Sequence, residues 1–262
     1  MRYFIMRAVY KYRRIATKYL YCRKVKLEIT TPVISFSFDD APRTAFSHGC
    51  EILSKIGASA TFYVSLGMLE SDSPSGTIAS INDLRRAVKE GHELGCHTFD
   101  HKNSWETTPT LFVQSVLKNR QVLSQIFPGM RFATLAYPIC GPRPATKQRI
   151  GKLFRCCRGG GQTFNCGEAD LNYLKAFFLD IRLRDSIDTL KRLIDKNAES
   201  RGWLIFATHD IDNNPSLFGC SKKVFEELVS HAANSGSLLL PVGKACENLQ
   251  ITGNEIESAP RS

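Results

Sequence analysis

The chain has 262 residues, of which 43% are hydrophobic, and a formal net charge of +10. This length suits a single α/β barrel, for which roughly 200–250 residues are usual. The charge is uneven, because residues 1–28 contain nine Lys or Arg and one acid, Glu28, which leaves only +2 for the rest of the chain. The basic excess therefore gives no reason to expect that the main domain binds nucleic acid.

The nine cysteines are odd in number and include no CxxC pair. Several lie in apolar, strand-like runs, where a free cysteine behaves as a small hydrophobic residue. We therefore predict a reducing compartment and no disulfide framework. No run approaches the roughly 18 apolar residues of a membrane span, and no ordinary signal peptide is recognisable. Together these features favour a cytoplasmic location.

Residues 1–25 are predicted to form an amphipathic helix. Arg7, Lys11, Arg14 and Lys18 form a basic stripe at i, i+4, i+7 and i+11, and apolar residues recur between them. One apolar face and one basic face are typical of a helix that lies at a membrane surface. The alternative is a helix packed on the domain with a solvated charged face. We predict that residues 1–31 form a separate basic segment, with the inner membrane surface as a candidate partner.

From residue 33 onward, strand-like runs alternate with helical patterns. Strands are expected near residues 33–38, 60–64, 93–97, 133–137, 154–158, 176–181, 203–207 and 238–242, and helices near 45–56, 80–90, 108–127, 186–194 and 221–235. Repeated β-then-α units indicate a parallel sheet. Because no dinucleotide glycine fingerprint follows the first strand, we predict a single distorted (β/α) barrel of seven or eight strands over residues 32–250. Residues 251–262 are polar and are predicted to form a flexible tail.

Two adjacent acids, Asp39 and Asp40, end the first barrel strand. Ionised carboxylates at the tip of a buried strand need a cation, a hydrogen-bond network or a proton. Imidazoles are available downstream. His97 and His101 stand at i, i+4, and His209 follows another apolar run. Two histidines, one carboxylate and a water form an ordinary hydrolytic metal site, and barrel enzymes build such sites at the carboxyl ends of their strands.

These motifs resemble those of the NodB-type polysaccharide deacetylases, carbohydrate esterase family 4. Residues 37–41, Ser-Phe-Asp-Asp-Ala, resemble the family's T-F-D-D-G motif. Residues 97–101 match its second motif in the H-x-x-x-H form, and residues 204–209 resemble its final motif, a hydrophobic strand that ends in histidine. Order and spacing also fit, and the resemblance extends over roughly residues 32–245.

The resemblance implies a metal-dependent hydrolase that removes N-acetyl groups from amino sugars of a glycan or glycan precursor. It implies that Asp40, His97 and His101 hold a divalent metal, most often zinc, although Co²⁺, Ni²⁺ and Fe²⁺ suit the same donors. It also implies that Asp39 is the general base that activates water and that His209 is the general acid for the leaving amine.

The chain departs from the family at the third and fourth motifs. The R-x-P-Y motif aligns with residues 136–139, Ala-Tyr-Pro-Ile, so its arginine is missing. The backbone N–H of Ile139 can still serve an oxyanion, and Tyr137 is a candidate substrate residue. We hypothesise that Arg182, near a strand end, replaces the missing arginine. Asp180 and Asp210 are both candidates to orient His209.

Other functions remain open. An amidase or imidase of the same superfamily would act on a small non-sugar amide. A degenerate member would bind glycan without turnover, and a membrane-surface scaffold would use the N-terminal helix. The intact candidate acid and base argue against the last two, since a binding module needs neither. Trp105, shortly after His101, could stack on a sugar ring or be a half-buried loop residue.

Overall fold

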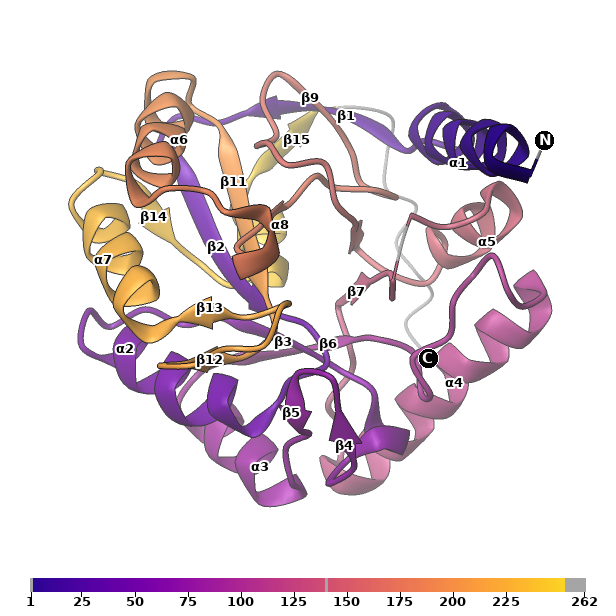
Figure 1. Cartoon of the computed structure of the whole chain (residues 1–262), viewed down its shortest axis with the longest axis horizontal. Helices are drawn as coiled ribbons and strands as arrows, with labels where there is room; N and C mark the ends of the chain where they lie inside the picture. The colour runs from indigo at the N-terminus through magenta and orange to yellow at the C-terminus, as the bar shows by residue number, and fades with distance from the viewer. Residues whose placement is uncertain (1, 140, 253–262) are drawn as a thin grey trace.

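The computed structural model describes residues 2–139 and 141–252. One curved, parallel sheet forms the centre of the molecule (Figure 1). Its seven-strand path runs β10 (Phe177–Phe178), β11 (Trp203–Thr208), β2 (Val33–Phe38), β3 (Thr61–Val64), β6 (Glu93–Cys96), β7 (Thr134–Ala136) and β8 (Cys156–Arg158), and β14 (Leu238–Leu239) pairs with β2 off this path. The predicted barrel of seven or eight strands is confirmed.

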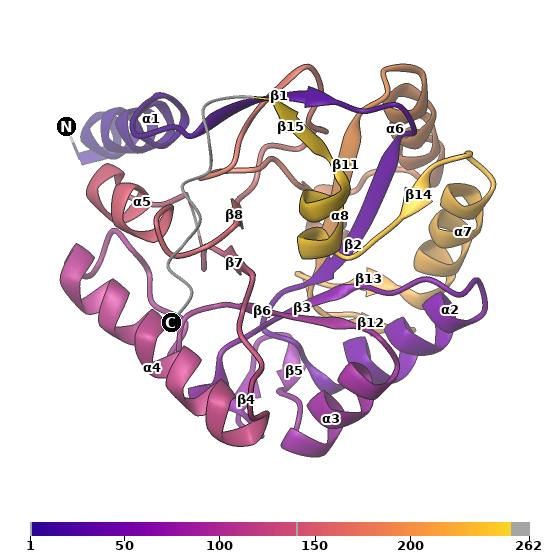
Figure 2. The same ribbon diagram turned by 180° about the vertical axis from the view of Figure 1, so that it is seen from behind.

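Helices cover the outside of this sheet (Figures 1 and 2). They are α2 (Cys50–Ser54), which continues the π-helical turn η1 (Ala45–Gly49), α3 (Ile81–Lys89), α4 (Pro109–Ile126), α5 (Pro144–Ile150), α6 (Ile187–Glu199) and α7 (Lys222–Ala233). Helix α8 (Val242–Asn248) instead packs on the other face of the sheet, where Val242 and Ala245 join the cluster of Trp203. The side chains of Ser80, Thr108, Ser186 and Ser221 accept backbone N–H groups at the starts of α3, α4, α6 and α7. These caps explain why the four helices were predictable within a few residues.

Strands β2 and β11 are buried along their whole length, on both faces. Phe36 and Phe38 of β2 pack outward, against the ring of Phe225 on α7. On the other face, Val33 joins a second cluster that includes Trp203 of β11. Burial on both faces is the normal state of a parallel sheet, and it holds the carboxyl end of β2 in a fixed position.

The N-terminal segment packs on the barrel. Helix α1 (Arg2–Tyr19) is followed by β1 (Lys24–Glu28), which pairs antiparallel with β9 (Glu168–Asp170) and β15 (Gln250–Thr252). Val25 and Leu27 of β1 belong to the same core cluster as Trp203. The domain boundary at residue 32 stays a prediction, although β1, which precedes it, packs into the core of the barrel.

Helix α1 lies beside α5 in both views (Figures 1 and 2). The buried Lys147 of α5 fixes this arrangement, since its Nζ donates to the carbonyl oxygen of Thr17 at 2.7 Å and pairs with Asp170 at 2.6 Å. Ala16 and Thr17 are buried on the inner side of α1, whereas Ile15 and Tyr19 are exposed.

The remaining elements are short connections. They are the hairpin of β4 (Asp72–Ser73) and β5 (Gly76–Thr77), the paired β12 (Ile211–Asp212) and β13 (Cys220–Ser221), and the 3₁₀ turns η2 (Leu66–Met68) and η3 (Ile181–Leu183). The predicted flexible tail begins inside β15, whose last residue is Thr252, and residues 253–262 lie outside the described residues.

Candidate active site

The candidate site residues meet where three strands of the sheet end. Asp40 follows β2, His97 and His101 follow β6, and His209 follows β11. Asp40 Oδ1 lies 3.2 Å from His101 Nε2 and 3.6 Å from His97 Nε2, and Asp40 Oδ2 lies 4.0 Å from His209 Nε2. Residues from distant parts of the sequence are thus brought together at the carboxyl edge, as parallel strands allow.

The loops that carry these residues have unusual backbone conformations. Asp40, Ala41, Thr98, His101 and Ile139 all have positive φ, between 52° and 66°. For residues with a side chain this left-handed region is uncommon, and it clusters at functional sites. The i, i+4 spacing of His97 and His101 therefore belongs to a left-handed bend after β6, not to a helical turn.

The hydrogen bonding of His97 leaves a lone pair aimed at Asp40. His97 Nδ1 lies 2.9 Å from the carbonyl oxygen of Ala136, which can only accept, so Nδ1 carries the hydrogen and Nε2 is free to bind a cation. Asp40 Oδ1 is buried and has no hydrogen-bond partner. Burial lowers the pKa of His97 to about 4, so no proton on this ring compensates the carboxylate. The donor set fits a divalent metal.

A second cluster, Cys50, Glu90 and His92, has metal-ligand residue types but the wrong hydrogen bonding. The backbone N–H of Ala60 donates to His92 Nδ1 at 3.0 Å, so the neutral ring carries its hydrogen on Nε2, the nitrogen that faces Glu90. Burial also raises the pKa of the Cys50 thiol to about 12. This cluster therefore offers no lone pair at His92 Nε2, and Asp40, His97 and His101 form the better candidate.

Asp39 is buried and pairs with a cation that the sequence did not suggest. Nη2 of Arg158, the last residue of β8, donates to Asp39 Oδ1, and both side chains are almost fully buried. Burial alone would raise the pKa of Asp39, but Arg158 first, and then His97 and His209, hold it below its ordinary value. Asp39 is therefore an ionised carboxylate at neutral pH.

The hypothesis that Arg182 replaces the missing arginine is wrong. Arg182 is half exposed and pairs with Asp180, at 2.6 Å between Nη2 and Oδ2. The guanidinium of Arg158 instead occupies the place beside Asp39, with the rings of Tyr63 and Phe178 within 5.4 Å. The signal that could have found Arg158 is its position at the carboxyl end of the strand-like run 154–158.

His209 is oriented by the backbone and not by a carboxylate. Its Nδ1 donates to the carbonyl oxygen of Phe218 at 3.1 Å, which directs Nε2 toward Asp40. Asp210 accepts from Ser216 instead. Asp180 lies close enough to His209 to interact electrostatically. Burial raises the pKa of Asp180, and the charges of His209 and Arg182 offset only part of that rise.

The loop after β7 separates the two candidate substrate residues. Ile139 is 65% exposed and follows β7 at the same edge of the sheet as the other site residues. Tyr137 is buried, with its ring beside those of Phe112 and Tyr173. We therefore no longer assign Tyr137 a substrate contact and regard it as a core residue.

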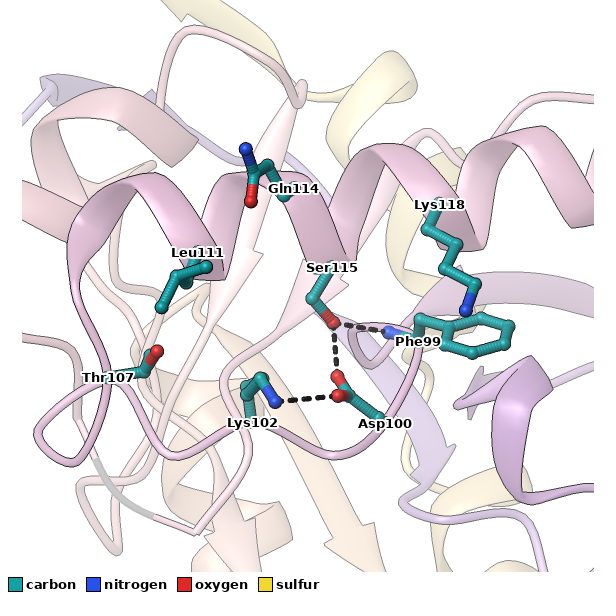
Figure 3. Close-up of a pocket in the computed structure, with 8 residues that line it drawn as sticks. All are labelled: Phe99, Asp100, Lys102, Thr107, Leu111, Gln114, Ser115 and Lys118. Atoms are coloured by element: carbon teal, nitrogen blue, oxygen red, sulfur yellow. Dashed lines mark hydrogen bonds and ion pairs between the residues drawn. The ribbon is translucent and has the colours of Figure 1, made fainter.

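Helix α4 holds the loop that contains His97 and His101 (Figure 3). Ser115 accepts from the backbone N–H of Phe99 at 3.0 Å and donates to Asp100 at 2.5 Å, and Asp100 also pairs with Lys102 at 2.7 Å. Lys118 lies 3.9 Å from the ring of Phe99. These residues line a pocket together with Thr107, Leu111 and Gln114. The contacts of Ser115 with Phe99 and Asp100 anchor the loop on α4.

Comparisons with known proteins concern the sequence family and the fold. The family model described as polysaccharide deacetylase matches residues 26–153. Among solved structures, the chitin deacetylase of Colletotrichum lindemuthianum aligns with a TM-score of 0.58 at 17% identity, covering 89% of this chain and 97% of that one. The family match covers just under half of the chain, and over these residues the chain resembles a divergent polysaccharide deacetylase.

Two further matches are similarly limited in identity or extent. A domain of a multidomain xylanase from the hindgut metagenome of Trinervitermes trinervoides aligns with a TM-score of 0.59 at 17% identity, over 83% of this chain and 91% of that one. A chitin deacetylase of Arthroderma benhamiae is 31% identical over 99 residues, which are 37% of this chain and 25% of that protein. The chain spans 25% or less of the length of the curated relatives it matches.

The contact between Asp39 and Arg158 predicts strong energetic coupling. Arg158→Met should lower the free energy of unfolding by about 3–5 kcal/mol, because it leaves a buried carboxylate uncompensated. Asp39→Asn should lower the free energy of unfolding by a similar amount. The loss in the double variant should be smaller than the sum of the two single losses by at least about 1 kcal/mol. Urea unfolding of the four proteins measures this coupling. Strictly additive losses would contradict the coupling. Arg182→Met combined with Asp39→Asn is the control pair, for which the losses in free energy of unfolding should be additive.

Proposed function

We propose that this protein is a metal-dependent hydrolase that removes N-acetyl groups from amino sugars of a glycan or glycan precursor. One observation carries the proposal. The buried, unpartnered Oδ1 of Asp40 faces the Nε2 atoms of His97 and His101, next to a second carboxylate, Asp39, that is held ionised. A cation site beside a base suits hydrolysis of an amide.

Each residue has a role that its environment supports. A divalent metal bound by Asp40, His97 and His101 would lower the pKa of water and polarise the acetyl carbonyl. Asp39 would take the proton of the attacking water, and Arg158 would keep this carboxylate ionised and oriented. The backbone N–H of Ile139 would donate to the developing oxyanion.

His209 would act as the acid in this scheme. Because Nδ1 already donates to Phe218, the proton for the leaving amine would be carried on Nε2, which points into the site. Protonation of the amine prevents expulsion of a poor, anionic nitrogen leaving group.

The metal site predicts a stoichiometry. Purified protein reconstituted with zinc and dialysed should retain about one metal per chain, measured by inductively coupled plasma mass spectrometry. The double variant His97→Ala/His101→Ala should retain none, since a single carboxylate remains. His231→Ala is the matched control, because this surface histidine pairs with Asp195 on the outside of the barrel. Equal metal content in all three proteins would contradict the assignment.

The acid and base predict a loss of turnover without a loss of metal. Wild type should release acetate from N-acetylated chitooligosaccharides, and Asp39→Asn and His209→Ala should each lower kcat by about 10²–10⁴-fold. Both should keep their metal. If wild type binds metal but releases no acetate, a small non-sugar amide is favoured as the substrate. If it neither binds metal nor releases acetate, a glycan-binding member without activity is favoured.

We also propose that the outer side of α1 lies at an anionic membrane surface, and that the protein acts in the cytoplasm. None of the helices in the described part of the chain has the length and hydropathy needed to cross a bilayer. The outer side of α1 exposes Ile15 and Tyr19 together with Lys11 and Lys18. Exposed apolar and basic side chains on one helix face suit an interfacial position.

This membrane proposal predicts lipid-dependent sedimentation. The protein should co-sediment with phosphatidylserine vesicles and less with phosphatidylcholine vesicles, since the helix adds attraction to anionic lipid. Ile15→Ser/Tyr19→Ser should reduce the bound fraction severalfold. Leu217→Ser, at an exposed leucine far along the chain on the β12–β13 connection, is the control. Equal binding by both variants would contradict a role for α1.

A further inference from the structure

Three residues from separate segments meet beside the candidate active site. Trp105 lies in the loop after β6, Arg143 directly precedes α5, and Arg13 is on α1. The guanidinium carbon of Arg13 lies 4.9 Å from the centroid of the Trp105 ring, and that of Arg143 lies 5.8 Å from it. All three side chains are partly exposed.

The loops that hold these residues also hold active-site residues. Trp105 Nε1 donates to the carbonyl oxygen of Gly141 at 2.6 Å, and the backbone N–H of Arg143 donates to Ser104 Oγ at 3.0 Å. These bonds join the loop of His101 to the loop of Ile139. Because Trp105 follows His101 so closely in the chain, the two lie within ~14 Å of each other, which is within reach of a short oligosaccharide.

Helix α1 is fixed against the same two loops. Thr17 Oγ1 donates to the carbonyl oxygen of Pro142 at 2.8 Å, and the ring of Tyr12 meets Trp105 edge-on at 6.3 Å. Arg13 therefore lies on the inner side of α1, close to the buried Ala16 and Thr17. It is held near the site and is not part of the outer side that exposes Tyr19.

The two guanidinium groups share one ring without a counter-charge. Within residues 2–139 and 141–252, neither Arg13 nor Arg143 forms an ion pair, whereas Arg158 and Arg182 each have a carboxylate partner. Two like charges near one ring repel each other, and a bound anion would relieve that repulsion. A guanidinium fork matches the geometry of carboxylate and phosphate, and an indole face suits a sugar ring.

We propose that Arg13, Trp105 and Arg143 form a subsite for a negatively charged group, a carboxylate or a phosphate, on the glycan substrate. This inference rests on the proposed deacetylase function. The N-terminal helix then contributes to substrate recognition, in addition to any contact with lipid. The substrate class becomes an anionic glycan that carries an N-acetylated amino sugar, with the charge on a residue next to the one that reacts.

Binding to charged and neutral probes tests this subsite independently of turnover. Isothermal titration calorimetry on the zinc-loaded full chain would compare N-acetylchitotetraose with a tetrasaccharide of alternating N-acetylglucosamine and glucuronate, and with an N-acetylglucosamine 1-phosphodiester. Wild type should bind one or both charged probes at least tenfold more tightly than the neutral one. Arg13→Gln and Arg143→Gln should each reduce that preference about tenfold, the usual effect of losing a charged hydrogen bond. Preference for the phosphodiester over the glucuronate probe, or the reverse, identifies the anion.

Two control variants distinguish this subsite from a lipid site and from a general effect of positive charge. Lys11→Gln removes a charge from the exposed side of α1 and should leave the preference unchanged, while Arg143→Lys should restore part of it. No preference in wild type, or an equal loss in Lys11→Gln, would overturn the proposal. Loss of binding to phosphatidylserine vesicles in Arg13→Gln without any change in saccharide preference would overturn it in favour of a lipid site. If charged probes bind as expected but no acetate is released, the deacetylase proposal fails and the subsite stands.

Discussion

The structure depends on two adjacent carboxylates at the end of β2, the buried Asp39 and Asp40, whose Oδ1 is buried. Neither can be ionised there without a compensating positive charge or hydrogen bonds, and the surroundings of the two carboxylates differ in this respect. Asp39 is compensated internally by Arg158, which comes from β8. Asp40 is left with a buried oxygen, Oδ1, that has no hydrogen-bond partner and faces the Nε2 atoms of His97 and His101. One acid is therefore suited to be a base and its neighbour to be a metal ligand, although the two are adjacent in sequence.

The surrounding fold keeps these charges in place. Strands β2 and β11 are buried on both faces, and the loops that follow β2, β6 and β7 contain the left-handed residues Asp40, His101 and Ile139. Such conformations persist only where neighbouring contacts over-determine them. Here Ser115 of α4 binds the loop of His101 through the backbone N–H of Phe99, and Trp105 binds the loop of Ile139. Helix α1 also packs against the loops of His101 and Ile139, through Tyr12 and Thr17.

Sequence reasoning reached the features that are encoded locally. Apolar runs followed by Asp40 or His209, and capped helices such as the one that begins after Thr108, can be recognised from neighbouring residues. Arg158 also ends a strand-like run, but its pairing with Asp39 could not be predicted locally, because 119 residues separate the two and they meet only through the curvature of the sheet. Arg182 was favoured for its position near a strand end, but Asp180, two residues away, already pairs with it. Short elements such as α5 were missed because seven residues give too little periodicity.

The most direct test of the proposed metal site is the position of the metal in a crystal of zinc-loaded protein, measured by anomalous scattering at the zinc edge. We predict one strong peak about 2.0–2.2 Å from Asp40 Oδ1, His97 Nε2 and His101 Nε2. Asp39 should remain paired with Arg158 and outside the coordination shell. A peak at Cys50 and His92, a peak bound by Asp39, or no peak at saturating zinc would contradict this assignment.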